Sequence, residues 1–204
     1  MVHNRNPPVI FEPSAFSSLL MSVVEIPGTE SMGLLLGHEE RRSISSRFRS
    51  CLAIDIAYPI QTAQRGRTSV TYGNLAARNR LHSTVSAVGL AIIGGFHSHP
   101  NTNTRLTKED KEFIFDELSS LKSKQGLEKW LEIVVKVTRI KKPSHSKFLS
   151  KMYASKSPRP GFYVLNNNSE VSGHLIIEPT VVYRIDMKGY WFFNGRVSNA
   201  ILCL

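Results

Sequence analysis

The fold is decided by residues 94–110, GGFHSHPNTNTRLTKED, which join an apolar segment to the start of a helix. The pattern of residues 91–96 is typical of a buried strand, and Pro100 ends that strand. A helix is expected over residues 107–125, because apolar side chains form one helical stripe there: Phe113, Ile114, Leu118 and Leu121. The order strand, loop, helix favours an α/β fold.

Two histidines in this stretch, His97 and His99, are spaced to share one ion. Side chains two residues apart in a strand point to the same side, about 6.6 Å apart along the chain, and Zn–N bonds measure about 2.0–2.1 Å. A helix that begins at Thr107 would place Asp110 in its first turn, as a candidate third ligand. Two histidines and one carboxylate leave a fourth position for water, which is the arrangement of a catalytic zinc site.

Each part of this set also has a simpler explanation. A His-X-His pair at the end of a strand also occurs as ordinary polar surface. The sequence from Thr107 to Asp110 fits a capping box, in which Thr107 is the N-cap and Asp110 answers it from the first turn. Metal binding and helix capping therefore compete for the Asp110 carboxylate.

An upstream segment makes the pattern more specific. Glu30 lies shortly before the glycine-bounded apolar strand Gly33–Gly37. A glutamate, such a strand and, far downstream, His-Ser-His-Pro, six residues and Thr-X-X-Asp resemble the JAMM (MPN-domain) zinc metalloprotease family over about residues 16–193. The resemblance implies an α/β single MPN domain, with a curved mixed β-sheet flanked by helices and two loop inserts.

The same resemblance implies a role for each residue of the motif. His97, His99 and Asp110 would hold one Zn²⁺ per chain together with a metal-bound water. Glu30 would act as general base and then as general acid, and the Thr107 hydroxyl would help to stabilise the oxyanion. The family typically has Ser at the position of Thr107, whose branched β-carbon restricts χ1.

The implied activity is that of a zinc-dependent isopeptidase or peptidase, a deubiquitinase-like hydrolase that removes ubiquitin or a ubiquitin-like protein from conjugates. The chain is similar to stand-alone prokaryotic members, so conjugation-pathway proteins from the same operon are candidate partners. Two alternatives stay open: a processing peptidase for a ubiquitin-like sulfur-carrier precursor, and a non-catalytic MPN interaction module. The net charge of +10 suggests an acidic partner or a solvated basic surface, but no recognised motif indicates nucleic acid.

Length and composition predict one domain over residues 14–204, after a flexible lead-in at residues 1–13. Two inserts are expected, at about residues 58–74 and 141–160. With only two cysteines among 204 residues, a disulfide framework and a four-cysteine zinc site are both excluded. The most apolar stretch, residues 174–193, is interrupted by charged residues, so we expect a soluble cytoplasmic protein without a membrane partner.

The remaining elements follow from hydrophobic periodicity and turn signals. Helices are expected from about residue 14 to residue 27 and over residues 75–88. Short strands are expected in the following segments: residues 33–37 and 51–57, joined by a polar turn at 38–50; residues 131–137; and a final meander of residues 161–165, 170–177, 181–186 and 190–193, with a turn at 188–189.

Overall fold

The computed structural model describes residues 6–44, 46–140, 159, 161–165, 168–178 and 181–204. Half of the described residues lie in strands and a quarter in helices. The elements are β1 (Val9–Phe11), α1 (Pro13–Glu25), β2 (Met32–Ile44), β3 (Arg47–Pro59), β4 (Ala63–Arg65), β5 (Val70–Tyr72), α2 (Leu75–Ala87), β6 (Ile92–Pro100), α3 (Lys108–Gln125), β7 (Lys129–Ile140), β8 (Phe162–Leu165), β9 (Glu170–Glu178), β10 (Val181–Phe193), β11 (Arg196–Asn199) and β12 (Leu202–Cys203).

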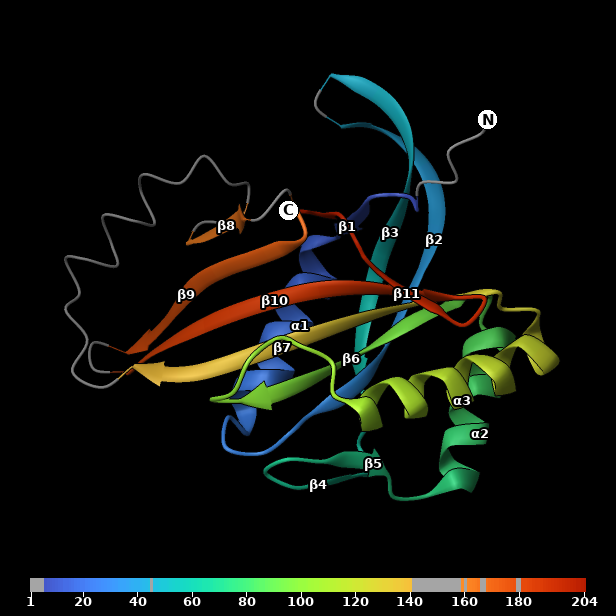
Figure 1. Cartoon of the computed structure of the whole chain (residues 1–204), viewed down its shortest axis with the longest axis horizontal. Helices are drawn as coiled ribbons and strands as arrows, with labels where there is room; N and C mark the ends of the chain where they lie inside the picture. Colours follow the sequence, from blue (N-terminus) through green and yellow to red (C-terminus); the bar gives the residue numbers. More distant parts are fainter. Residues whose placement is uncertain (1–5, 45, 141–158, 160, 166–167, 179–180) are drawn as a thin grey trace.

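One large sheet organises the molecule (Figure 1). Its strands follow the order β12-β1-β3-β2-β6-β7-β10-β9-β8, and β11 pairs with β10 off this path. The pairs β1/β12, β1/β3 and β6/β7 are parallel and the other pairs are antiparallel. The sheet curls until its edges approach each other, and the Leu202 amide beside one edge donates to the Asn168 carbonyl beside the other at 2.6 Å. The result is a nearly closed, barrel-like sheet.

The expected α/β class, with the helix-flanked mixed sheet of an MPN domain, is therefore wrong. The described chain is mainly β, with a barrel-like sheet and three helices. The sequence reading missed strands whose side chains are polar. Much of the expected turn at residues 38–50 instead extends β2 and β3 into a long hairpin. Because the backbone groups of these two strands satisfy each other, this ladder needs no alternating apolar pattern.

The expected turn at residues 188–189 is also wrong, since β10 runs through it without a break. Gly189 is required there for close packing rather than for a turn. A Cβ atom on Gly189 would lie 2.8 Å from a methyl group of Leu202 and 2.9 Å from the Cβ of Ala200. A glycine inside a strand often marks this kind of close approach.

Two apolar clusters lie on opposite faces of the curled sheet. The first surrounds α1, where the Phe16 ring contacts the rings of Phe11 and Phe162 at centroid distances of 5.9 and 5.1 Å. The second lies under α3 and includes Leu118 and Leu121. Figure 1 shows α1 behind the sheet and α3 in front of it. The expected helices at the positions of α1, α2 and α3 are confirmed within two residues at each end.

The described segments also bear on the expected boundaries. Strand β1 falls inside the expected lead-in of residues 1–13, and its Val9 and Phe11 are buried in the sheet. The first insert, residues 58–74, contains the hairpin β4–β5. Nearly all of the second, residues 141–160, lies outside the described residues. In the described part of the chain, none of the helices combines the length and apolar character needed to cross a membrane.

Candidate metal centre

Three predicted metal ligands converge at the end of β6. His97 and His99 are buried on this strand, between β2 and β7. Helix α3 begins beside the strand end and brings Asp110 to them in its first turn. The Nε2 atoms of the two histidines lie 3.1 Å apart, and the Asp110 carboxylate oxygens lie 3.6 Å from Nε2 of His97 and 3.5 Å from Nε2 of His99. These three side chains are called the donor set below.

The spacing of the donor set fits one divalent cation. Atoms bound to zinc at about 2.0–2.1 Å with tetrahedral angles lie about 3.3 Å from one another. The histidine nitrogens lie 3.1 Å apart, and Asp110 faces His97 with Oδ1 at 3.6 Å and His99 with Oδ2 at 3.5 Å. With one donor atom taken from each residue, the three atoms all lie within 4.8 Å of one another. Among the described residues, these three side chains form a group that could hold a metal ion.

Hydrogen bonds at the far side of each imidazole fix its tautomer. His97 Nδ1 lies 2.7 Å from Oε1 of Glu132, and His99 Nδ1 lies 3.0 Å from the backbone oxygen of Asn103. Both partners are acceptors, so each Nδ1 carries a proton, and each Nε2 is the ring atom that faces the centre and could bind a cation in place of its own proton. Metal-binding histidines are typically oriented in this way.

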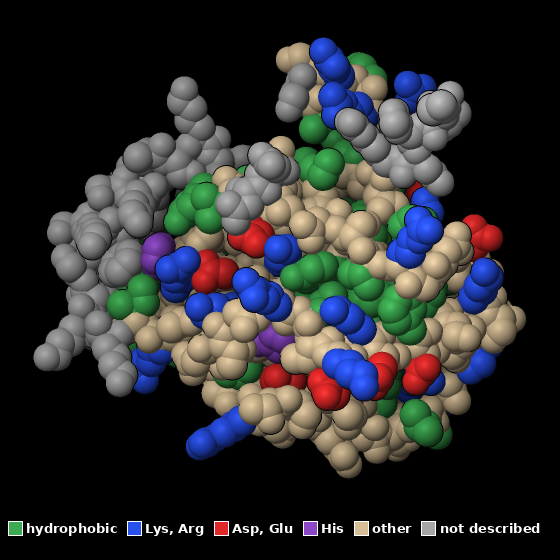
Figure 2. All heavy atoms as spheres, viewed as in Figure 1, with side chains coloured by type: hydrophobic (Ala, Val, Ile, Leu, Met, Phe, Trp, Pro, Cys, Tyr) green, Lys and Arg blue, Asp and Glu red, His purple; other side chains and the backbone are tan. Residues whose placement is uncertain are grey.

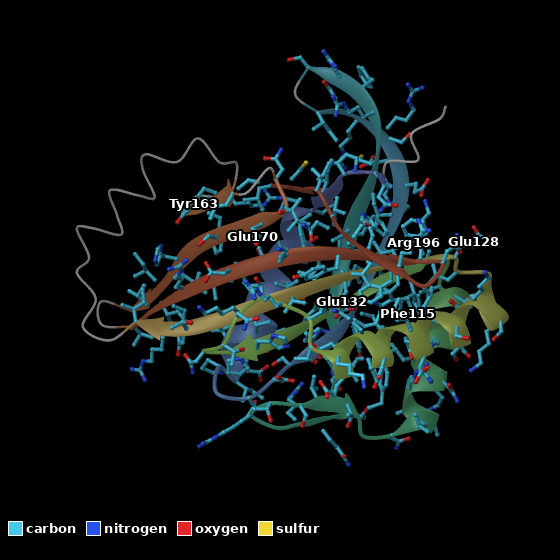
Figure 3. The ribbon with its side chains drawn as sticks, in the orientation of Figure 1. Phe115, Glu128, Glu132, Tyr163, Glu170 and Arg196 are labelled. Atoms are coloured by element: carbon cyan, nitrogen blue, oxygen red, sulfur yellow. The ribbon has the colours of Figure 1, made fainter. Side chains whose placement is uncertain are left out.

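Glu132 is a site residue that the sequence analysis missed. It lies on β7, labelled in Figure 3, and only 4% of it is exposed. Its Oε2 accepts a hydrogen bond of 2.6 Å from the Trp130 indole, so both carboxylate oxygens are engaged. The sequence did contain a signal for Glu132, because it is the single acidic residue in the apolar run of residues 131–135. An acid in a buried strand is rare unless it has a partner. Gly95 leaves room for this pair, since a Cβ there would lie 2.8 Å from the Trp130 ring.

The electrostatics of the donor set favour a positive charge at its centre. Burial lowers the pKa of His97, but the carboxylates of Asp110 and Glu132 outweigh this effect and raise the pKa to about 10. Burial raises the pKa of Asp110, yet the imidazoles of His97 and His99 lower it well below its usual range. Within the described part of the chain, no lysine or arginine forms an ion pair with either carboxylate.

The predicted acid/base residue, Glu30, shares a cavity of about 280 Å³ with the donor set and Thr107. Only 7% of Glu30 is exposed, and burial raises its pKa although His99 and His97 act in the opposite direction. Its backbone is held from two sides. The Glu30 amide donates to the Gly66 carbonyl at 2.7 Å, and the next residue, Ser31, exchanges two hydrogen bonds of 2.8 Å with Ser98 on β6.

Thr107 forms the predicted capping box without displacing Asp110 from the donor set. The Thr107 hydroxyl oxygen accepts from the Asp110 amide at 3.1 Å, and the Thr107 amide donates to Oδ2 of Asp110 at 2.7 Å. The Asp110 carboxylate therefore caps α3 and faces both histidines at once, so the two interpretations do not compete. Because the Thr107 oxygen serves only as an acceptor in the cap, its O–H can still donate toward the cavity.

The fold and the site together define a mainly β protein with a candidate divalent-metal centre at the end of a buried strand. No family model matches the chain, and no curated protein matches it. Among solved structures, the solution structure of protein DSY2949 from Desulfitobacterium hafniense is similar, with a TM-score of 0.52 and 14% identity. The match covers 96% of this chain and 92% of that one. At this identity the similarity shows a shared fold and nothing further.

Proposed function

We propose that the chain is a zinc-dependent peptidase or isopeptidase that removes ubiquitin or a ubiquitin-like protein from conjugates. The observation that carries the proposal is the convergence of His97, His99 and Asp110, whose facing atoms lie 3.1–3.6 Å apart. Glu30 in the same cavity supplies the acid/base group that hydrolysis needs. The likeness of these residues to the JAMM metalloprotease motif supports the choice of reaction and of substrate class.

The chain's own residues divide the chemistry between them. A zinc ion held by the donor set would act as a Lewis acid and make a bound water nucleophilic near neutral pH. Glu30, whose pKa is raised by burial, is suited to accept a proton from water and return it to the departing amine. The Thr107 hydroxyl, at the cavity wall, would donate to the oxyanion that develops on the scissile carbonyl.

The test begins with the metal. Purified protein should contain about one zinc per chain, and a strong chelator should abolish cleavage of lysine-linked diubiquitin. Glu30→Gln should keep the zinc and lose turnover, because only the proton transfer is removed. The matched control is Glu112→Gln, which changes an exposed glutamate on α3 in the same way. Zinc-free protein, or a native rate in Glu30→Gln, would contradict the proposal.

A second substrate separates the isopeptidase from the alternative processing peptidase. In a linear ubiquitin fusion the scissile bond is a main-chain peptide, whereas in lysine-linked diubiquitin the leaving group is a side-chain amine. Preferential cleavage of the linear fusion would assign a processing role to the same site. Zinc binding without cleavage of either substrate would instead support a non-catalytic module.

A further inference from the structure

The long hairpin of β2 and β3 projects from the body of the molecule, and its outer part carries no acidic residue. This part, residues 41–44 and 46–50, is called the arginine hairpin below. It contains Arg41, Arg42, Arg47 and Arg49, and the strands stay paired as far as Ile44 and Arg47. Figure 1 shows the hairpin rising above the sheet, and Figure 2 shows Lys and Arg side chains gathered on this projection.

Most of the positive charge on the arginine hairpin is not neutralised by the described part of the chain. Arg42 binds Glu12 at 2.5 Å and Glu40 at 2.6 Å. Arg41, Arg47 and Arg49 form no ion pair with any described residue, and all three are exposed. Arg49 also lies directly opposite Arg42 in the ladder, where like charges destabilise a strand pair. Three exposed guanidinium groups are therefore available to an external anion.

An exposed aromatic residue, Phe48, lies between Arg47 and Arg49 in the sequence, and its side chain points to the opposite face of the strand. Phe48 is 74% exposed, more than any other large apolar side chain that the structure describes. Most of its ring area is in contact with solvent, so it could still be buried against a partner. An exposed aromatic ring on the same hairpin as several guanidinium groups matches the composition of surfaces that contact nucleic acids, where rings contact bases and arginines contact phosphates.

We propose that the arginine hairpin binds duplex DNA by entering the major groove. The major groove admits a two-stranded β-ribbon and is about 8.5 Å deep, and the segment from Arg41 to Ile44 extends about 10 Å. The free arginines can reach phosphates along the groove walls, and the hydroxyls of Ser43, Ser46 and Ser50 add donors of the kind that also contact phosphates. The net charge of +10 favours the encounter.

The proposal is independent of the metal centre. Along β2, Met32 pairs with His97 at one end of the strand, whereas the arginine hairpin forms the other end. Ile44 lies twelve positions after Met32 in this strand, which corresponds to about 40 Å along it. A failure of DNA binding would therefore leave the proposed peptidase untouched, and the reverse also holds.

The experiment measures fluorescence anisotropy of a labelled 20-base-pair duplex at several salt concentrations. Three arginine–phosphate contacts predict a slope of log affinity against log salt of roughly −3. Arg47→Gln/Arg49→Gln should reduce the magnitude of this slope by about 2 and weaken binding roughly tenfold or more at low salt. Phe48→Ser should weaken binding and leave the slope unchanged, because the ring contacts no phosphate.

The matched control is Arg80→Gln/Lys122→Gln, which removes the same charge from exposed positions on α2 and α3. Its affinity should stay within about twofold of the wild type. The proposal is overturned if the control weakens binding as much as the hairpin variant, or if the wild type does not bind the duplex at low salt. It is also overturned if polyglutamate or anionic lipid vesicles bind the hairpin as tightly as DNA does. Thermal unfolding confirms that each variant is folded.

Discussion

In the part of the chain that the structure describes, carboxylates are wholly or partly buried in two regions on the α3 side of the sheet, and the two regions balance charge differently. Between α2 and α3, Glu117 is 4% exposed and is bound by the Arg78 guanidinium through both carboxylate oxygens. The Tyr72 hydroxyl donates to the same carboxylate at 3.3 Å, and the Arg78 guanidinium lies 5.0 Å from the centre of the Tyr72 ring. This group is called the helix ion pair.

At the metal centre, by contrast, the side chains that contact the carboxylates of Asp110 and Glu132 are histidines and an indole, and Asp110 also accepts from the Thr107 backbone amide. The helix ion pair carries its own permanent cation and is complete without a ligand. The donor set has acceptor atoms that converge on one point and no permanent cation in the described chain. Buried carboxylates of the same chemistry can therefore belong to a structural contact in one place and to a ligand site in another. The permanent counter-charge distinguishes the two.

The largest expected effect comes from Arg78→Met, which leaves Glu117 buried without its counter-charge. The free energy of unfolding should fall by about 3–5 kcal/mol, because a buried charge loses its partner. Urea denaturation measures the change. Arg78→Met/Glu117→Leu should recover most of the loss, since an apolar pair has no charge to desolvate. A loss below about 1 kcal/mol in the single variant would show that Glu117 needs no counter-charge, and the contrast between the regions would fail.

The pH dependence of stability tests the same region through His82 on α2. Burial, with the nearby charges of Arg78 and Lys124, lowers the pKa of His82 to about 4. Its Nε2 lies 3.6 Å from Oε1 of Glu117, whose charge is already bound to Arg78. Because the folded pKa lies below the unfolded value of 6.5, the stabilisation is complete above about pH 6.5 and is lost as pH falls toward 4.

We expect His82→Gln to remove this component of the pH dependence. Between about pH 7 and pH 4, the wild type should lose at most about 3 kcal/mol more unfolding free energy than the variant. Urea denaturation at a series of pH values gives the difference directly. Parallel curves for the two proteins would show that His82 is protonated in the folded state as readily as in the unfolded chain.

Glu132→Gln tests the comparison at the metal centre, by changing the carboxylate that binds His97. The neutral amide keeps the shape of the side chain but no longer orients and polarises His97 as a carboxylate does. Loss of such an outer partner typically weakens metal binding 10–100-fold. Competition with a chromophoric zinc chelator measures the affinity. Glu117→Gln is the matched control, because it neutralises an equally buried glutamate outside the donor set. Equal losses in the two variants would mean that Glu132 acts only through stability.

The sequence predicted the donor set because the information is local. The spacing of His97 and His99 fixes their common face, and a helix that starts at Thr107 must carry Asp110 in its first turn. The structure brings all three side chains together, and their role as metal ligands stays a prediction. Glu132 was missed because its partner is 35 positions away, so the contact depends on how β7 aligns with β6.

The fold class was harder to predict for a related reason. Curling of the sheet depends on which strands become neighbours, and the parallel pairs of β1 with β3 and β12 join segments far apart in the chain. The polar hairpin of β2 and β3 carries no apolar alternation in its outer half, because it has no core to face. Hydrophobic periodicity therefore located the helices and most of the buried strands, and missed the buried strand β1 and the solvated half of the hairpin.

Thr107 has a structural role next to the metal centre, because it caps α3 beside the donor set. The smallest expected effect comes from changing this residue. Thr107→Ala removes the hydroxyl that accepts from the Asp110 amide. The free energy of unfolding should fall by about 1 kcal/mol, measured by urea denaturation, and Thr107→Ser should restore it. Zinc affinity should change little in either variant. The hydrogen bond that orients the Asp110 carboxylate comes from the Thr107 backbone amide, which both substitutions keep. A large loss of zinc affinity in Thr107→Ala would show that the cap and the donor set are one energetic unit.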